Sequence, residues 1–258
     1  LHFMNKLLTL GSLIGLLLLA RIYVVTTASK KHPTALPRID LLTLTLGCDQ
    51  SLTMANATCI DTSYIHKVCL AALNYKGPSI IGFDAIAAPN DSALLRLILL
   101  AQLPCNGNSM SKRAAISEEN RKIQRINLLR IEKFLQDCQR RLETAKAHDD
   151  WTDLNGYFVK INRFHSEPQF ARAVKLSFIQ TDGDHDVMVM VNGQPKRIRS
   201  LNCPEWVSGL QLYSSNWSSQ YPDCNFRMLE SPEGFLDFFT QFINKQQHDN
   251  GNSTSATR

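Results

Sequence analysis

The chain has 258 residues, of which 44% are apolar, 20% charged and 8% aromatic. This balance excludes a disordered tail protein, a collagen-like repeat and a polytopic membrane protein, because each of these shifts the composition strongly. The formal net charge of +5 is small for this length, so no nucleic-acid partner is expected.

Residues 1–28 form an apolar N-terminal segment. An uncharged, mainly aliphatic run from Leu7 to Ala20 follows Lys6, which predicts a secretory signal peptide cleaved after Ala28 or, if uncleaved, a membrane anchor. Three basic residues between positions 30 and 38 favour an orientation that keeps the rest of the chain in the cytoplasm, which argues against export. We nevertheless expect an extracytoplasmic protein that is secreted, periplasmic or membrane-anchored.

Seven cysteines are scattered along the chain without a C-x-x-C pair: Cys48, Cys59, Cys69, Cys105, Cys138, Cys203 and Cys224. Because short-range ligand pairs are missing, the sequence predicts no zinc site. In an oxidising compartment, seven cysteines predict three disulfides and either one free thiol or one intermolecular bond, whereas in the cytosol they predict seven reduced thiols. Cys203 and Cys224 flank a loop with little aliphatic content, so we predict that they form a disulfide. Cys138 lies in an apolar helical stripe and is our candidate for the free thiol.

Residues 29–110 are predicted to form a helical, cysteine-bearing region. The alternating run from Ile39 to Leu46 is typical of a strand. Apolar residues at helical spacing predict one helix over residues 58–73 and a second over residues 92–103.

A long basic helix is predicted to begin at Ser117 and to end near His148. Between residues 112 and 146, ten basic residues oppose five acidic ones, so this segment carries the whole net charge. Its apolar stripe has members three and four residues apart: Leu128, Ile131, Leu135, Cys138, Leu142 and Ala145.

The opposite side of this helix mixes apolar and basic residues: Lys122, Ile126, Leu129, Lys133 and Arg140. One interpretation is that the helix lies between two halves of the protein and buries both sides. The other is that this face binds an acidic protein or an anionic membrane surface.

Beyond residue 150 the pattern alternates. Strands are predicted at residues 157–164, 174–180, 186–191 and 194–201, with Asn192-Gly193 as a hairpin turn. Ser231-Pro232 then starts a helix that carries four phenylalanines. The predicted fold class is therefore α+β, in which residues 111–246 hold the long helix and an antiparallel β-meander covered by the C-terminal amphipathic helix. Residues 247–258 are expected to be a disordered tail.

No motif identifies a reaction, a metal or a cofactor. Asp182, Asp184 and Asp186 resemble the start of a calcium loop, but Val187 and Gly193 occupy positions that require glycine and glutamate. The sequence contains neither a nucleophile elbow nor a phosphate-binding glycine loop. We therefore predict no catalytic residue, no metal ligand and no cofactor.

The sequence favours an exported, non-enzymatic binding or interaction protein that presents its basic helix face to an acidic partner. One alternative is a secreted helical receptor ligand, because the closing helix, GFLDFFTQFINK, resembles the last helix of short helical cytokines. The other is an extracytoplasmic hydrolase, which would need a polar cleft that gathers histidine with aspartate or cysteine.

Overall fold

The computed structural model describes residues 40–51, 54, 60–87, 93–105, 109–146, 151–217 and 224–252. The expected signal peptide or anchor lies outside these residues. None of the helices described is long and apolar enough to cross a membrane.

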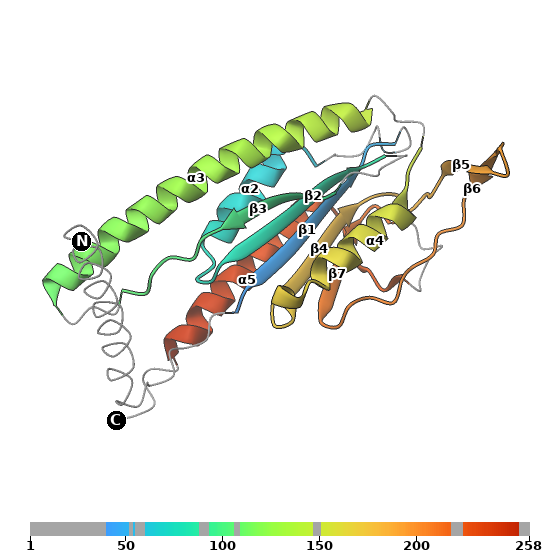
Figure 1. The fold of residues 1–258 in the computed structure, drawn as a ribbon. Helices are drawn as coiled ribbons and strands as arrows, with labels where there is room; N and C mark the ends of the chain where they lie inside the picture. The colour runs from blue at the N-terminus through green and yellow to red at the C-terminus, as the bar shows by residue number, and fades with distance from the viewer. Residues whose placement is uncertain are drawn as a thin grey trace, which may run out of the picture. The chain divides into compact units, whose positions relative to one another are not determined.

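A six-stranded sheet in the order β3-β2-β1-β4-β7-β8 organises the compact unit from Ile39 onward (Figure 1). Its strands are β1 (Leu42–Asp49), β2 (Ser79–Ile86), β3 (Leu95–Leu99), β4 (Val174–Gln180), β7 (Leu210–Ser215) and β8 (Arg227–Leu229). Only β3 is antiparallel to its neighbour, and the other pairs are parallel.

In the described part of the chain, four α-helices, a short 3-10 helix (Pro168–Phe170) and a separate hairpin accompany this sheet. The α-helices are α2 (Thr62–Leu73), α3 (Met110–Lys146), α4 (Leu154–His165) and α5 (Pro232–Asn252). Strands β5 (Val187–Val191) and β6 (Gln194–Ile198) form a two-stranded hairpin of their own.

Strand β1 shows how the sheet separates two cores. Leu42, Leu44 and Leu46 are completely buried in a cluster with residues of α2, α3 and α5. Thr43 and Thr45 lie on the other face, where both hydroxyls bond the ring of His165 in α4. A strand that is buried on both faces is typical of a parallel sheet covered by helices on both sides.

This topology contradicts the predicted α+β class with its helical N-terminal half and antiparallel meander. The fold is a doubly wound α/β sheet, and the N-terminal half supplies three of its strands. Residues 157–164 belong to α4, since Leu154, Phe158 and Ile161 are buried at helical spacing. The segment 92–103, expected to be a helix, contains edge strand β3.

Several predicted elements are present. Strand β1, helices α2, α3 and α5 and the hairpin turn at Asn192-Gly193 lie where the patterns placed them. Helix α3 begins earlier than expected, at Met110, and α5 continues beyond residue 246 to Asn252.

The connection from β4 to β7 has no helix in it. Parallel neighbours usually require a helical crossover, but residues 181–209 form the β5–β6 hairpin followed by a coil. The predicted disulfide between Cys203 and Cys224 is present and ties this coil to the segment before β8. Trp206 packs there against Phe158 of α4 in an edge-to-face contact.

Candidate functional site

The carboxyl edge of the sheet brings polar side chains together beside β1. The chain winds to one side of β1 through β2 and β3, and then to the other side through β4 and β7. The winding direction therefore reverses between β1 and β4. In open α/β sheets, ligands bind outside the carboxyl ends of the strands at such a switch point.

Asp49 lies at this switch point, as the last residue of β1, and it is completely buried. Its Oδ1 atom accepts hydrogen bonds from the Ser51 backbone N–H at 2.9 Å and from the Thr152 hydroxyl at 3.2 Å. Its Oδ2 atom accepts a bond from the Thr181 hydroxyl at 2.7 Å. Asp49 is thus held by three segments that converge from β1, from the residues before α4 and from the end of β4.

Asp182 adds a second carboxylate to this edge. It follows Thr181, is partly buried, and accepts a hydrogen bond from the Asp184 backbone N–H at 2.9 Å. On the neighbouring strand, Ser215 is buried and pairs with Gln180 of β4. Its hydroxyl has no hydrogen-bond partner among the residues that the structure describes. A buried polar atom of this kind is uncommon and marks a position where a ligand or water can bind.

The pKa of Asp49 is raised to about 6, chiefly by burial and to a smaller extent by the charge of Asp182, against the opposing effect of the Ser51 and Thr181 hydrogen bonds. The charged form of this carboxylate is therefore disfavoured when no cation is near. A bound cation would remove that penalty, because opposite charge favours the ionised form.

The donor set fits a hard divalent cation. Mg²⁺ and Ca²⁺ prefer oxygen ligands from carboxylates, hydroxyls and water. No cluster of three or more histidine, cysteine or acidic side chains suits a metal within the part of the chain that the structure describes. A cation here would rest on the carboxylates of Asp49 and Asp182, supplemented by the hydroxyls of Ser51 and Thr152.

The mixed face predicted on the long helix is exposed. Ile126 and Leu129 are 41% and 61% exposed, and the side chains of Lys122 and Arg140 are 59% and 75% exposed. Lys133 is exposed as well. On the opposite side, Ile131, Cys138, Leu142 and Ala145 of the predicted stripe are buried, while Leu128 is not. Helix α3 therefore does not bury both of its sides.

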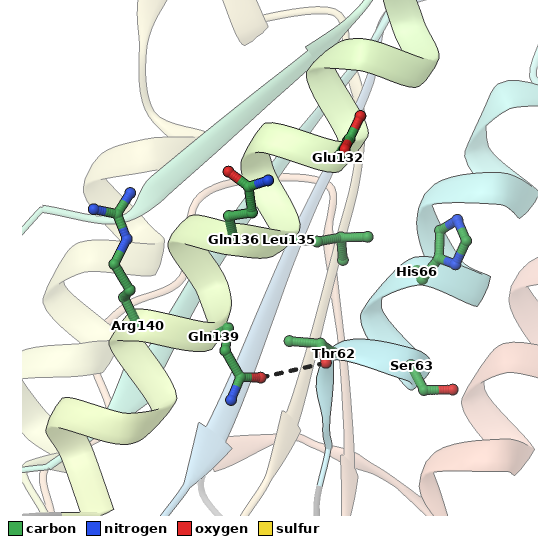
Figure 2. A pocket seen from close by; sticks show the side chains of 8 residues that line it. All are labelled: Thr62, Ser63, His66, Glu132, Leu135, Gln136, Gln139 and Arg140. Carbon is green, nitrogen blue, oxygen red and sulfur yellow. Dashed lines mark hydrogen bonds between the residues drawn. The ribbon is translucent and has the colours of Figure 1, made fainter.

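Two grooves flank this face and separate the predicted residues. Figure 2 shows the larger one, a cavity of about 820 Å³ between α2 and α3. The side chains of Arg140 and Gln136 line it from α3, and that of His66 lines it from α2. The second groove, of about 400 Å³, lies between α3 and β3 and contains Lys133 with Arg96 and Arg130. Lys122, Ile126 and Leu129 lie in neither.

Ion pairs reduce the charge of this face. Lys122 pairs with Glu119 at 3.4 Å, and Arg140 pairs with Asp137. Such exposed pairs contribute little to stability, but they lower the charge available to a partner.

The buried histidines do not form a hydrolase constellation. His165 bonds Thr43 and Thr45, and burial lowers its pKa to about 3. His185 bonds the Thr152 carbonyl at 3.1 Å and the Asn155 amide at 3.0 Å. Among the described residues no carboxylate hydrogen-bonds either ring, and the hydroxyls that bond His165 belong to the completely buried Thr43 and Thr45, so the geometry does not favour the hydrolase alternative.

Cysteine pairing differs from the expectation of three disulfides. Among the described residues, Cys138 is a buried free thiol, as predicted, but Cys69 and Cys105 are free thiols as well, and the Cys48 thiol takes part in a hydrogen bond to the Ile60 carbonyl at 3.6 Å instead of a disulfide. Cys59 lies outside the described residues. Desolvation raises the pKa of Cys69 to about 12, which makes this thiol unreactive at neutral pH.

The sequence interpretation missed the carboxyl-edge site. The sequence patterns single out Asp182 only within the calcium-loop resemblance, which fails at Val187 and Gly193, and they do not single out Asp49, Ser51 or Thr152. A signal existed in the polar residues that end the buried strands at Asp49 and Thr181. Recognising it required knowledge that the two strands are parallel neighbours.

Comparisons with known proteins assign no family to the chain. Neither a protein-family model nor a curated protein matches it. Among solved structures, it is similar to the pilus adhesin SpaC from Lactobacillus rhamnosus GG, with 10% identity, 81% of this chain and 31% of that chain covered, and a TM-score of 0.42.

Two further structures are similar at lower scores. Proximal thread matrix protein 1 from the mussel byssus shows 9% identity and a TM-score of 0.37, with 81% of this chain and 48% of that chain covered. A von Willebrand factor type A protein from Catenulispora acidiphila shows 11% identity and a TM-score of 0.36, with 80% and 42% covered. The chain thus spans a third to a half of the proteins it resembles, and these values assign it no function.

Proposed function

We propose that this protein is an extracytoplasmic binding protein that holds a divalent cation at the carboxyl edge of its sheet and binds an acidic ligand there. The observation that carries the proposal is Asp49, a buried carboxylate at the topological switch point with hydroxyls on both of its oxygens. The disulfide between Cys203 and Cys224 supports an oxidising compartment, because disulfides persist in proteins outside the cytoplasm.

Each residue has a distinct part in this proposal. Asp49 and Asp182 would supply the negative charge that holds the cation, and Ser51 and Thr152 would supply neutral oxygen ligands. The bound cation would present an open coordination position to a carboxylate of the partner. Thr181 holds the Asp49 side chain in place from the end of β4.

Thermal unfolding with Mg²⁺, Mn²⁺ or Ca²⁺, against the same protein in EDTA, tests this function. A cation at a hundred times its dissociation constant should stabilise the protein by about 2.7 kcal/mol. Asp49→Asn and Asp182→Asn should abolish that shift. Asp237→Asn, which removes an exposed carboxylate of α5, should retain it. A wild-type melting temperature that none of the three cations changes would overturn the proposal.

We propose a second binding surface on α3, the exposed face formed by Lys122, Ile126, Leu129, Lys133 and Arg140. Its partner would be an acidic protein or an anionic membrane surface. The favouring observation is that Ile126 and Leu129 remain exposed between cations on a helix whose other side is already packed. Apolar residues exposed in line with charges are typical of a contact surface.

Reversal of Lys122, Lys133 and Arg140 to glutamate tests this surface, with polyglutamate and vesicles that contain anionic lipid as probes. Binding should fall with rising salt and should be lost in the triple variant. A matched triple reversal of exposed cations elsewhere, at Lys67, Arg172 and Lys245, should leave most of it. If binding persists in the variant reversed at Lys122, Lys133 and Arg140 and does not depend on salt concentration, this surface is not the binding site.

A further inference from the structure

The β5–β6 hairpin exposes apolar side chains beside the carboxyl-edge site. Met188, Met190 and Val191 are 46%, 69% and 43% exposed. The hairpin forms a sheet of only two strands, and Figure 1 shows it away from the six-stranded sheet, at the carboxyl ends of its strands. Its outer edges have no strand partner among the described residues. A protein normally protects such apolar edges unless they serve in binding.

The strand register places the two methionines on one face. Met188 pairs with Arg197 and Met190 pairs with Pro195, and alternate residues of a strand point to the same side. The Arg197 guanidinium lies over the Trp151 ring, 5.3 Å from its centre. Trp151, Arg197 and the two methionines thus form one surface, which we call the hairpin face. Tryptophan, arginine and methionine are the residues enriched in protein interfaces.

The base of the hairpin is fixed to the carboxyl-edge site. Thr152, which bonds Asp49, also exchanges two backbone hydrogen bonds with Asp186, at 2.9 and 3.0 Å. Arg197 bonds Asp186 as well, and Arg199 pairs with it at 3.5 Å. One partner can therefore place a ligand atom in the carboxyl-edge site and pack a neighbouring side chain of its own on the hairpin face.

The charge of the hairpin indicates the chemistry of that partner. From Asp184 to Arg199 the hairpin and its base carry three basic residues (Lys196, Arg197 and Arg199) and two acidic ones (Asp184 and Asp186), and Asp186 pairs with both arginines. The net charge of +1, with Lys196 in no ion pair among the described residues, favours an acidic chain over a basic one. Methionine side chains adapt to apolar groups of varied shape, which suits a polypeptide better than one rigid ligand.

We infer that the hairpin face binds an acidic polypeptide segment whose carboxylate occupies the carboxyl-edge site and whose adjacent apolar side chains pack on Met188 and Met190. This inference deepens the proposed function and rests on it. The partner is thus a protein, and the hairpin contributes to its selection.

Synthetic peptides provide the probe. A fluorescent panel carries one aspartate flanked by leucine or phenylalanine in half of its members and by serine in the other half. Fluorescence polarisation with Mg²⁺ should show tighter binding of the apolar half. The double variant Met188→Ser/Met190→Ser should weaken that binding by about tenfold. Met228→Ser changes a methionine of similar exposure, 51%, on β8, and should have no effect.

The change in melting temperature caused by the cation distinguishes a failure of the hairpin face from a failure of the proposed cation site. The double variant should retain that shift, because its changes lie outside the ligand set. If it binds the apolar peptides as tightly as wild type while Asp49→Asn does not bind them, the hairpin face is refuted and the proposed function stands. Failure of wild type to bind any peptide in Mg²⁺, despite a normal melting shift, also overturns the inference. The inference is likewise overturned if the double variant binds the peptides as wild type does and loses only its binding to anionic vesicles. Loss of the melting shift in wild type refutes the proposed function itself.

Discussion

The two faces of the six-stranded sheet are covered by different means. On one face, α2, α3 and α5 pack apolar side chains on the strands, and Phe235 stacks on Phe178 with ring centres 4.5 Å apart. On the other face, α4 shares the cover with the coil of residues 199–209. Polar groups are buried there, including His165, and a disulfide holds the coil.

The coil shows what a segment without helical hydrogen bonds requires. Asn162 of α4 accepts a bond from the Val207 N–H and donates one to the Glu205 carbonyl. Seven residues earlier, Asn155 does the same for the Asn202 N–H and the Ser200 carbonyl. A helix satisfies its own backbone and needs only an apolar stripe to pack. A coil needs side-chain partners for its backbone groups instead.

The largest expected effect lies on the apolar face. Phe235→Asp places a carboxylate at a completely buried position and removes the stacked ring, which should cost about 5 kcal/mol or more. Urea unfolding and near-ultraviolet circular dichroism should show loss of cooperative folding. Gln241→Asp, on the exposed side of the same helix, should unfold like wild type. A normal urea midpoint for Phe235→Asp would show that α5 does not stabilise the sheet.

Loss of the disulfide should lower the free energy of unfolding by less than Phe235→Asp does, and its effect should be confined to a smaller part of the molecule. Replacement of Cys203 and Cys224 by alanine opens a loop of sequence separation 21, which should cost about 3 kcal/mol in the chain-entropy model. Hydrogen exchange should accelerate in residues 199–217 before it does so in β1. Cys105→Ala, which removes an exposed free thiol, is the control. Equal acceleration on both faces of the sheet would contradict the view that the coil depends on this bond.

The same difference between the faces explains which elements could be predicted. Helices α2, α3 and α5 have apolar stripes that pack on one face, so periodicity alone identified them. Strand β2 is buried on both faces, from Ser79 to Ile86, and therefore has no alternation to detect. The run from Tyr157 to Phe164 is rich in aromatic and β-branched residues, which favoured a strand although its buried positions recur at helical spacing.

The candidate sites differ in the same way. The face of α3 follows from helical geometry within one segment, so its residues could be selected from the sequence. The carboxyl-edge site combines Asp49, Thr152 and Thr181, which are more than 100 residues apart at the extremes. The parallel pairing of β1 with β4 brings Asp49 and Thr181 together, and the backbone bonds between Thr152 and Asp186 hold Thr152 beside them. Local patterns carry no information about such pairing.

His165 makes the polar face sensitive to acid. Burial lowers its pKa to about 3, below the ordinary value of 6.5. Folding therefore favours the neutral ring, and the resulting stability is present above pH 6.5 and is lost as the pH falls towards 3. At pH 5 the loss should be about 2 kcal/mol relative to neutral pH. Chemical unfolding across pH 4–7 measures it. His165→Gln should flatten this part of the profile, and an unchanged slope would mean that other groups cause it.

The smallest effects come from single asparagines, which allow the two faces to be compared directly. Asn127 of α3 bonds the N–H and carbonyl of Leu100 at 2.9 Å each, as Asn162 of α4 bonds the coil. Either asparagine changed to alanine should cost about 1–2 kcal/mol, because it leaves backbone groups without partners. Gln124→Ala, at an exposed position of α3, is the control and should change stability by less than about 0.5 kcal/mol.

Hydrogen exchange at single amides then separates the faces. In Asn127→Ala, exchange should rise at Leu100 alone, because β3 keeps its ladder with β2. In Asn162→Ala it should rise across residues 200–209, because the coil has no ladder of its own and its segments depend on one another. If the two variants accelerate exchange over equally short stretches, the coil is as independently ordered as the strand, and the contrast between the faces reduces to the disulfide.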